Sequence, residues 1–218
     1  MLTKIVRHTC QTGIRAFGAA GNSNWAHVDM APVDPILGIN DAFKKDTSPK
    51  KQLLGVGAYR TDEGKPYILP CVTEAEKRIL ANKMDHEYAG IDGIPSFRLK
   101  ASALAFGEDK DLLGRIASCQ SLSGTGALRV GFEFLKQWYP NKNAQVYIPD
   151  PTWPTHRGIS EKSGYSVATY RYYDRANRSF DCNGMLEDLD KAPNESIVVL
   201  HSCAHNPTGQ DPSIAQWK

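Results

Sequence analysis

The sequence lacks any apolar run long enough to cross a membrane, and it lacks a strong excess of charge of either sign. Its 218 residues are 41% hydrophobic and carry 26 Lys and Arg against 24 Asp and Glu. A membrane-spanning helix needs roughly 18 or more consecutive apolar residues, so no membrane span is expected. Ordinary apolar content argues against a disordered chain. The near balance of charges argues against a nucleic-acid-binding protein.

The sequence also lacks a cysteine pattern that would point to disulfides or a metal. Its five cysteines are odd in number and widely scattered, with no CxxC pair. This pattern argues against a disulfide framework and against a zinc ribbon. It fits a reducing compartment such as the mitochondrial matrix or the cytosol.

Acidic residues are absent from the first 28 positions, which carry Lys4, Arg7 and Arg15. Without this segment the chain has 23 basic and 24 acidic residues, so the positive balance belongs to its start. A basic, acid-poor, amphipathic start is typical of a mitochondrial transit peptide. We therefore predict a transit peptide over residues 1–22, with a plain basic N-terminus as the alternative.

Apolar periodicity and turn signals predict alternating helices and strands over most of the chain. Asp34-Pro35 and the pair Thr73 and Glu76 are typical helix starts. The patterns predict helices from Pro35, at 73–82, 97–106, 124–138, 155–162 and 185–191, and from Pro212. They predict strands at 53–59, 116–122, 144–148, 165–172 and 197–200. This alternation predicts an α/β layered domain with a largely parallel sheet.

The glycine-containing segment Ser123-Gly124-Thr125-Gly126 lies between a predicted strand and a predicted helix. At this place glycine lets the backbone approach a ligand, and a helix N-terminus offers unpaired N–H groups to an anion. The segment matches neither the dinucleotide fingerprint, which would need glycine in place of Arg129, nor a P-loop. A phosphate-binding loop and an ordinary glycine turn capped by Ser and Thr both remain open.

Two histidines, His201 and His205, follow a predicted strand and precede the turn-forming Asn206-Pro207-Thr208-Gly209. Four-residue spacing would bring the imidazoles onto one face only in a helix. We therefore favour histidines that are hydrogen-bonded at a strand end over a metal site. Asn206 could direct its amide from the strand end into a cleft.

Trp153 and His156 follow another predicted strand, in Asp150-Pro151-Thr152-Trp153-Pro154-Thr155-His156. The indole could lie against a planar ring, with His156 in support, or it could pack in the core. Three predicted strand ends thus lead into polar or aromatic turns, and such ends line the ligand crevice of an open α/β sheet. The expected ligand is planar and phosphorylated.

Several of these stretches resemble the aspartate aminotransferases of the class I pyridoxal-phosphate enzymes, and the mitochondrial form most of all. The matching segments include LLGVGAYR (53–60), EYAGIDG (87–93), SGTGALRVG (123–131), TWPTH (152–156) and HSCAHNPTGQDPSIAQWK (201–218). The resemblance implies an incomplete fold of type I, with a three-layer large domain, a mostly parallel sheet and part of a small domain. Residues 23–66 would form the N-terminal arm and the first part of the small domain, and 67–218 the large cofactor-binding domain.

The same resemblance implies how pyridoxal 5′-phosphate would be held. Ser123, Gly124 and Thr125 would form the cup for its phosphate. Trp153 would stack on its pyridine ring and touch the substrate carboxylate. Asn206 would hydrogen-bond the ring hydroxyl oxygen and the substrate carboxylate.

Further positions take their expected roles from the resemblance as well. Tyr88 would reach the cofactor phosphate of the neighbouring subunit in a homodimer, and Gly57 would offer its N–H to the substrate. His156, with His201 behind it, would support the acid that pairs with the pyridine nitrogen. The residues that would line the active-site mouth are Ile36 and Leu37. No metal is expected.

The implied reaction transfers an amino group from L-aspartate to 2-oxoglutarate in the mitochondrial matrix, with small amino and oxo acids as the partners. In the family, a Schiff-base lysine, an aspartate and a carboxylate-clamping arginine complete the site, and all three would lie beyond Lys218. We therefore expect no catalytic residue in this chain and no activity from it alone. The alternatives are a short non-catalytic product that acts as a binding or interaction protein, and an unrelated binder of a phosphorylated ligand.

Overall fold

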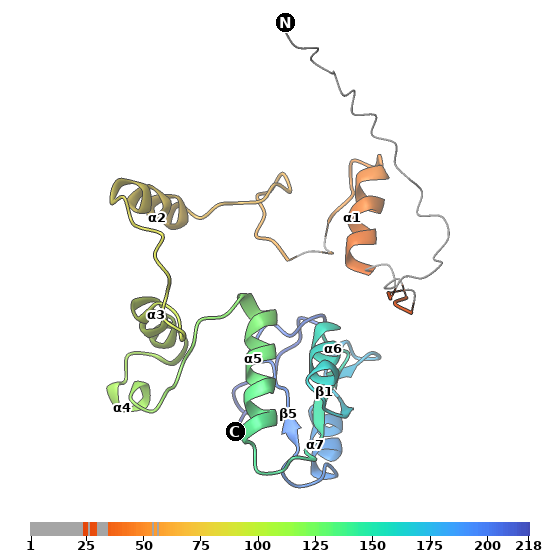
Figure 1. The fold of residues 1–218 in the computed structure, drawn as a ribbon. Coiled ribbons are helices and arrows are strands. Elements are labelled where there is room, and N and C mark those ends of the chain that lie inside the picture. The colour runs from red at the N-terminus through yellow and green to blue at the C-terminus, as the bar shows by residue number, and fades with distance from the viewer. Residues whose placement is uncertain (1–23, 26, 30–34, 54, 56) are drawn as a thin grey trace, which may run out of the picture. The chain divides into compact units, whose positions relative to one another are not determined.

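The computed structural model describes residues 24–218 except 26, 30–34, 54 and 56. The predicted transit peptide therefore lies outside the described residues. The chain divides into two compact units between Asp85 and His86. Figure 1 shows the elements of each unit. Among the described residues, no helix has both the length and the apolar character that crossing a membrane requires.

The described residues of the first unit form two helices, α1 (Pro35–Lys45) and α2 (Pro70–Ala81). A helix was expected from Pro35, and α1 confirms it, whereas its predicted cap Asp34 lies outside the described residues. The capping box predicted at Thr73 is wrong, because α2 begins three residues earlier with Pro70 in its first turn. The fixed φ of proline suits that position, so the helix starts there without a side-chain cap.

The strand predicted over residues 53–59 is not present in its described positions, 53, 55 and 57–59. A tight return of the chain follows instead, with an antiparallel bridge between Arg60 and Pro66. The N–H of Tyr67 donates to the carbonyl of Tyr59 at 2.8 Å. An apolar segment becomes a strand only where another backbone pairs with it, and among the described residues of this segment the pairing is limited to this bridge.

The second unit holds the sheet and most of the helices. Its helices are α3 (Pro95–Phe106), α4 (Lys110–Leu113), α5 (Ser123–Trp138), α6 (Thr155–Lys162) and α7 (Cys182–Asp190). Its strands are β1 (Val146–Asp150), β2 (Val167–Arg171), β3 (Tyr173–Asp174), β4 (Ser179–Phe180) and β5 (Ile197–Val198). These elements confirm the predicted helices at 97–106, 124–138, 155–162 and 185–191 and the predicted strands at 144–148, 165–172 and 197–200, with shifted ends.

Strands β2, β1 and β5 form a parallel sheet in that order, with β1 in the centre. Val146 of β1 is in register with Val167 of β2 and with Ile197 of β5. The short strands β3 and β4 form a separate antiparallel pair. The parallel sheet confirms the α/β prediction, and its strand order places the carboxyl ends of β1 and β5 next to each other.

Alternating side chains of the central strand β1 pack into two hydrophobic cores on opposite faces of the sheet. Val146 and Ile148 pack with Phe132 of α5 and Tyr165, and Ile159 of α6 joins them. The other face carries a second cluster, whose buried residues are Tyr170, Tyr172 and Met185. Helices α5 and α6 therefore cover one face and α7 the other, which gives three layers (Figure 1).

Two further predictions for this unit are wrong. Residues 116–122 form no strand, although their pattern is strand-like, because no strand of the described chain runs beside them. Residues 212–218 form a turn rather than a helix. Asp211, predicted to cap that helix, instead accepts hydrogen bonds from the N–H groups of Ala204 and His205.

Candidate functional site

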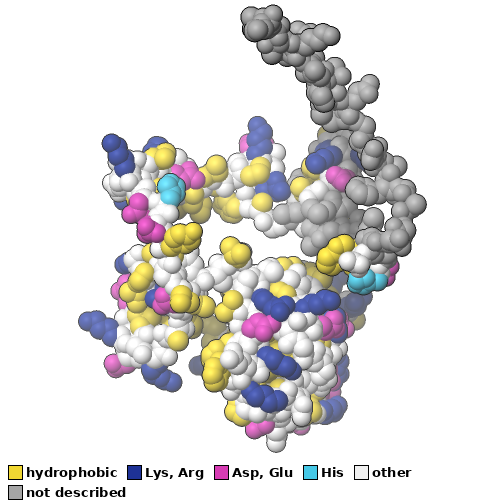
Figure 2. Space-filling model, in the orientation of Figure 1, with side chains coloured by type: hydrophobic (Ala, Val, Ile, Leu, Met, Phe, Trp, Pro, Cys, Tyr) yellow, Lys and Arg dark blue, Asp and Glu magenta, His cyan; other side chains and the backbone are white. Residues whose placement is uncertain are grey.

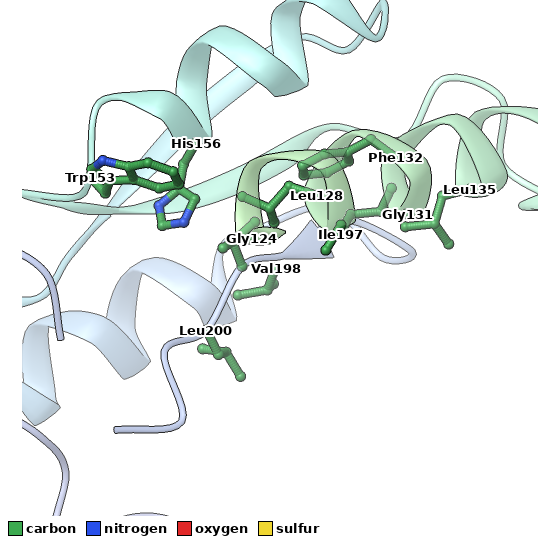
Figure 3. A pocket seen from close by; sticks show the side chains of 12 residues that line it. Gly124, Leu128, Gly131, Phe132, Leu135, Trp153, His156, Ile197, Val198 and Leu200 are labelled. Atoms are coloured by element: carbon green, nitrogen blue, oxygen red, sulfur yellow. The ribbon is translucent and has the colours of Figure 1, made fainter. Parts of the chain in front are cut away.

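One cavity of the second unit joins three of the predicted site residues. It has a volume of about 650 Å³, and its lining includes Gly124, Trp153 and His156. Figure 3 shows Trp153 and His156 at one end of this cavity and Leu135 at the other. The segment after β1 and the start of α5 thus meet at one place, as expected for a ligand crevice at strand ends.

The N-terminus of α5 presents backbone N–H groups without a protein acceptor. Leu122 precedes the helix without a side-chain cap, and Ser123 has a φ of +57°. The N–H of Gly126 donates to the carbonyl of Leu122, whereas among the described residues no acceptor faces the N–H groups of Gly124 and Thr125. Two free donors at the positive end of a 16-residue helix suit an anion. The alternative of a turn capped by Ser or Thr is not what forms here.

Trp153 is half-buried and lies against a histidine. Its ring and that of His156 are perpendicular, with centroids 5.4 Å apart. Trp153 also lines the cavity that Gly124 borders. The indole is therefore held by one neighbour and open to the cavity beside it.

A hydroxyl joins the two predicted supporting histidines, His156 and His201. Thr152 Oγ1 lies 2.8 Å from His156 Nδ1 and 3.5 Å from His201 Nε2. The backbone N–H of Asn206 donates to His201 Nδ1 at 3.2 Å, so neutral His201 carries its proton on Nε2. The Thr152 hydroxyl can then donate to His156 Nδ1, which places the His156 proton on Nε2. The Nε2–H of His156 is thereby available as a donor.

Burial disfavours the charged form of these histidines. Desolvation lowers the pKa of His156, and the nearby His201 lowers it further. Desolvation also lowers the pKa of His201, although Asp211 acts against this. For His205, burial and then His201 lower the pKa to about 4. A neutral imidazole has one donor and one acceptor nitrogen, so the hydrogen bonds that link His156, Thr152 and His201 each have one defined direction.

His205 anchors the turn that carries Asn206. Its ring is stacked on Tyr172, with centroids 3.7 Å apart and planes at 12°. Its Nδ1 lies 2.8 Å from the Thr208 hydroxyl, and Asp211 accepts its backbone N–H at 2.9 Å. The expected histidines hydrogen-bonded at a strand end are therefore present. In the described part of the chain, no three His, Cys, Asp or Glu side chains gather as metal ligands.

The remaining predicted site residues do not line the cavity of about 650 Å³. Asn206 is exposed beside this anchored turn, and Tyr88 is 95% exposed. Gly57 lies in the first unit and lines a separate cavity of about 400 Å³. Ile36 and Leu37 lie in α1, but their side chains are outside the described part. The roles of these residues stay predictions.

Sequence reasoning missed Thr152 and Asp211 as parts of this arrangement. Thr152 stands in the TWPTH stretch, four residues before His156, but its second partner is 49 residues away. Asp211 looked like a helix cap because Pro212 follows it. An acidic residue that closely follows an Asn-Pro-Thr-Gly turn can also accept hydrogen bonds from backbone N–H groups at the start of that turn. This signal could have suggested the observed role of Asp211.

The fold and the free N–H groups at the N-terminus of α5 agree with comparisons to known proteins. These comparisons define the class of this protein. The chain belongs to the family of class I and II aminotransferases, whose model matches residues 49–218. Its relatives include proteins named mitochondrial aspartate aminotransferase. The one from Schizosaccharomyces pombe is 52% identical over 88% of this chain and 44% of its own length. The one from Gallus gallus is 48% identical over 92% and 48%.

Solved structures agree with this assignment. The cytoplasmic aspartate aminotransferase of Saccharomyces cerevisiae superposes with a TM-score of 0.81 at 44% identity, over 89% of this chain and 47% of that one. An aromatic-amino-acid aminotransferase of Burkholderia pseudomallei, covalently bound to pyridoxal phosphate, superposes with 0.84 at 42%, over 90% and 49%. The type I aminotransferase fold is therefore present but incomplete, because the chain spans about half the length of the relatives it matches.

Proposed function

We propose that this chain supplies the cofactor-phosphate and ring-stacking half of a pyridoxal-phosphate-dependent aspartate aminotransferase. The observation that carries the proposal is the pair of free N–H groups of Gly124 and Thr125, of which Gly124 borders the cavity that Trp153 lines. A planar, phosphorylated cofactor needs hydrogen-bond donors for its phosphate close to a flat side chain, here Trp153, for its ring. Relatives named aspartate aminotransferase, at 46–52% identity, support L-aspartate as the amino donor, and 2-oxoglutarate is the acceptor in this proposal.

In this proposal the start of α5 binds the cofactor phosphate. The N–H groups of Gly124 and Thr125 donate to its oxygens, and the hydroxyls of Ser123 and Thr125 add two further donors. Nothing lies within 4 Å of the place that a Cβ on Gly124 would occupy, so the backbone is open to close approach. The positive end of the helix dipole adds to the attraction.

Trp153 and Asn206 orient the cofactor ring and the substrate. The indole stacks on the pyridine ring, and the Asn206 amide donates to the ring hydroxyl oxygen and the substrate carboxylate. When bound, pyridoxal phosphate serves as the electron sink for amino-group transfer. The Nε2–H of His156, oriented by Thr152 with His201 behind it, donates to the acid that pairs with the pyridine nitrogen.

The proposal assigns the other residues to substrate access and to a homodimer. Gly57 offers its N–H to the substrate, and Tyr88 reaches the cofactor phosphate of the neighbouring subunit. Their exposure, with Tyr88 at 95%, is compatible with contacts outside the described chain. The residues proposed to line the active-site mouth are Ile36 and Leu37.

Residues 1–22 act as a transit peptide in this proposal, and the protein works in the mitochondrial matrix. Residues 23–66 belong to the arm and small domain, and 67–218 to the large domain. None of the lysines in these 218 residues carries the cofactor. Incubation with pyridoxal phosphate and borohydride should therefore label no single lysine specifically.

Equilibrium binding of pyridoxal phosphate to the 218-residue chain tests the proposal, with phosphate-free pyridoxal as the comparison ligand. We expect measurable binding of the phosphorylated form and weaker binding of pyridoxal. A Ser123→Ala, Thr125→Ala double variant should lose affinity for the phosphorylated form alone. Hydrogen bonds to a charged group contribute about 1.5–3 kcal/mol each, which is about tenfold or more in affinity per hydroxyl.

Ser96→Ala is the matched control, because Ser96 is an exposed hydroxyl in the first turn of another helix, α3. It should leave both affinities unchanged. Equal affinity of the double variant and the unchanged chain would remove Ser123 and Thr125 from the phosphate site. Equal binding of pyridoxal and its phosphate would remove the start of α5 as an anion site.

A further inference from the structure

The turn that follows α1 carries the only serine or threonine of the chain that directly precedes a proline, in Ser48-Pro49. Ser48 is exposed and lies outside any helix or strand. Because proline disfavours the helical conformation of the residue before it, the pair favours an extended chain at the serine. Protein kinases bind the segment that they modify as an extended chain, and one class of them requires proline directly after the serine. The Ser48 hydroxyl is therefore accessible in the sequence context that this class selects.

Two lysines follow this pair directly. Lys50 and Lys51 stand two and three positions after Ser48, where the same class of kinases prefers a cation. Lys and Arg side chains project from the surface of the described chain in Figure 2, where a second protein can reach them. The family model matches residues 49–218, so Ser48 lies outside the positions that define the aminotransferase class. The motif therefore does not follow from membership in that family.

The side chain of Lys51 caps the C-terminal end of α1. Its Nζ donates to the carbonyl of Phe43 at 2.8 Å and to that of Asp46 at 2.6 Å. The same Nζ lies 4.4 Å from the centroid of the Phe43 ring. The last carbonyls of a helix have no donor within the helix and form its negative end, so an ammonium group is stabilising there. The end of α1 thus depends on a cation that the next turn supplies.

Ser48 lies in the same turn as this lysine. The N–H of Lys51 donates to the carbonyl of Ser48 at 3.3 Å, and the N–H of Lys50 donates to Ser48 Oγ at 3.2 Å. The N–H of Ser48 donates to Oδ1 of Asp46 at 2.8 Å, just after the end of the helix. A phosphate on Ser48 Oγ would therefore lie in the turn that Lys51 closes, near the negative end of α1.

We propose that Ser48 is a phosphorylation site for a proline-directed protein kinase and that its phosphate draws Lys51 away from the last carbonyls of α1. The kinase transfers the γ-phosphoryl group of ATP. The bond from the γ-phosphorus to the bridging oxygen breaks, a bond to Ser48 Oγ forms, and ADP leaves. The hydroxyl proton passes to the aspartate base of the kinase. A phosphate carries about −1.5 to −2 charges at pH 7, so it attracts the ammonium and is repelled by the helix C-terminus.

Helix α1 lies against the chain that follows this turn. The place that a Cβ on Gly55 would occupy is 3.0 Å from Cγ2 of Ile39, so α1 is in close contact with the segment that leads to Gly57. The same helix carries Ile36 and Leu37 in its first turn. A loosened α1 would therefore change access to the substrate. This last step rests on the proposed function, whereas the modification and the release of Lys51 do not.

Incubation of the 218-residue chain with ATP and a purified cyclin-dependent kinase with its cyclin tests the site. We expect mass spectrometry to find a phosphate on Ser48. Ser48→Ala should lose this phosphate, and Pro49→Ala should lose most of it, because that variant keeps the hydroxyl and both lysines but not the proline. Thr47→Ala is the matched control, since Thr47 is an adjacent exposed hydroxyl without a following proline. It should leave the modification unchanged. No phosphate on Ser48, or equal modification of Pro49→Ala, would overturn the proposed site.

Hydrogen–deuterium exchange measures the release of Lys51. In the phosphorylated chain, the amides of residues 44–46 should exchange about two- to fivefold faster, the range expected for loss of one favourable charge at a helix end. Lys51→Gln without phosphate should give the same acceleration. Lys50→Gln is the control and should give none, because within the described residues no hydrogen bond joins the Lys50 side chain to α1. Unchanged exchange at 44–46 after phosphorylation would overturn the link to Lys51. These readouts need neither cofactor nor activity, so they fail independently of the proposed function.

Discussion

The carboxylate of Asp211 holds the backbone of His205 and with it the turn that carries Asn206. Its Oδ1 accepts the N–H of His205 at 2.9 Å, and its Oδ2 accepts the N–H of Ala204 at 2.7 Å. These bonds, the one from His205 first, lower the pKa of Asp211. Ala204 has a φ of +52°, a left-handed conformation that is strained for a residue other than glycine. Asp211 therefore stabilises backbone that would otherwise relax.

Replacement of Asp211 by Asn should loosen this turn. The amide has one acceptor oxygen in place of two, so its NH₂ group would face one of the two N–H donors. We expect faster amide exchange over residues 204–209, measured by hydrogen–deuterium exchange, and unchanged exchange in β1. Asp174→Asn is the control, because that carboxylate accepts the N–H groups of Ala176 and Asn177 in a turn elsewhere. Unchanged exchange over 204–209 in Asp211→Asn would show that the turn does not depend on the carboxylate.

The neutral, buried His205 should make stability depend on pH. Its pKa is lowered to about 4 by burial first and His201 second, whereas an unfolded histidine titrates near about 6.5. Between these values the unfolded state binds a proton that the folded state does not. The free energy of unfolding is therefore highest above about pH 6.5 and falls as the pH drops toward about 4. Urea unfolding across this range measures the slope.

His205→Gln removes the titrating group and should flatten this slope in part. The slope should not vanish, because burial also lowers the pKa of His156 and His201. The variant should be less stable at every pH, since the stacking on Tyr172 is weakened. A slope identical to that of the unchanged chain would mean that His205 is not the group that resists protonation.

Thr152→Val should change the protonation pattern of His156 more than it changes the fold. Without the hydroxyl, His156 Nδ1 loses its partner at 2.8 Å, and the preference for the proton on Nε2 weakens. Nitrogen-15 chemical shifts of the imidazole measure this directly. We expect a loss of about 0.5–1.5 kcal/mol in the free energy of unfolding. Thr152→Ser keeps the hydroxyl and should restore the shifts, and a Val variant with unchanged shifts would contradict the relay.

The elements that could be predicted from the sequence are those whose signals are local. Helix α6 occupies Thr155–Lys162, as its periodicity indicates, and the apolar face of α5 identifies that helix equally well. Strand formation depends on a partner that local pattern does not reveal. Residues 197–200 pair with β1 over part of their length, whereas residues 116–122, also predicted as a strand, have no neighbouring strand in the described part of the chain.

The candidate site also combines features that could be expected from the sequence with contacts that could not. The approach of Trp153 to the start of α5 agrees with the expectation that polar or aromatic turns gather at strand ends, although residues 116–122, just before α5, form no strand. The hydroxyl of Thr152 between two histidines could not be expected, because its contacts depend on side-chain directions and on a partner far along the chain. Asp211 was misjudged because a helix cap and a bond back into a turn require the same residue type.

The packed core of the second unit can be tested with Ile148→Ala. Ile148 is 1% exposed and packs with Val146, Phe132 and Tyr165. Removal of a buried isoleucine side chain typically costs about 2–5 kcal/mol, through lost burial and the cavity left behind. Ile214→Ala, at a position that is 80% exposed, should change the free energy of unfolding by less than about 0.5 kcal/mol. Urea unfolding followed by circular dichroism compares the two. Equal effects would mean that this core does not pack in the isolated chain. A large effect confined to Ile148 would show that α5, α6 and the sheet form a packed core in the isolated chain.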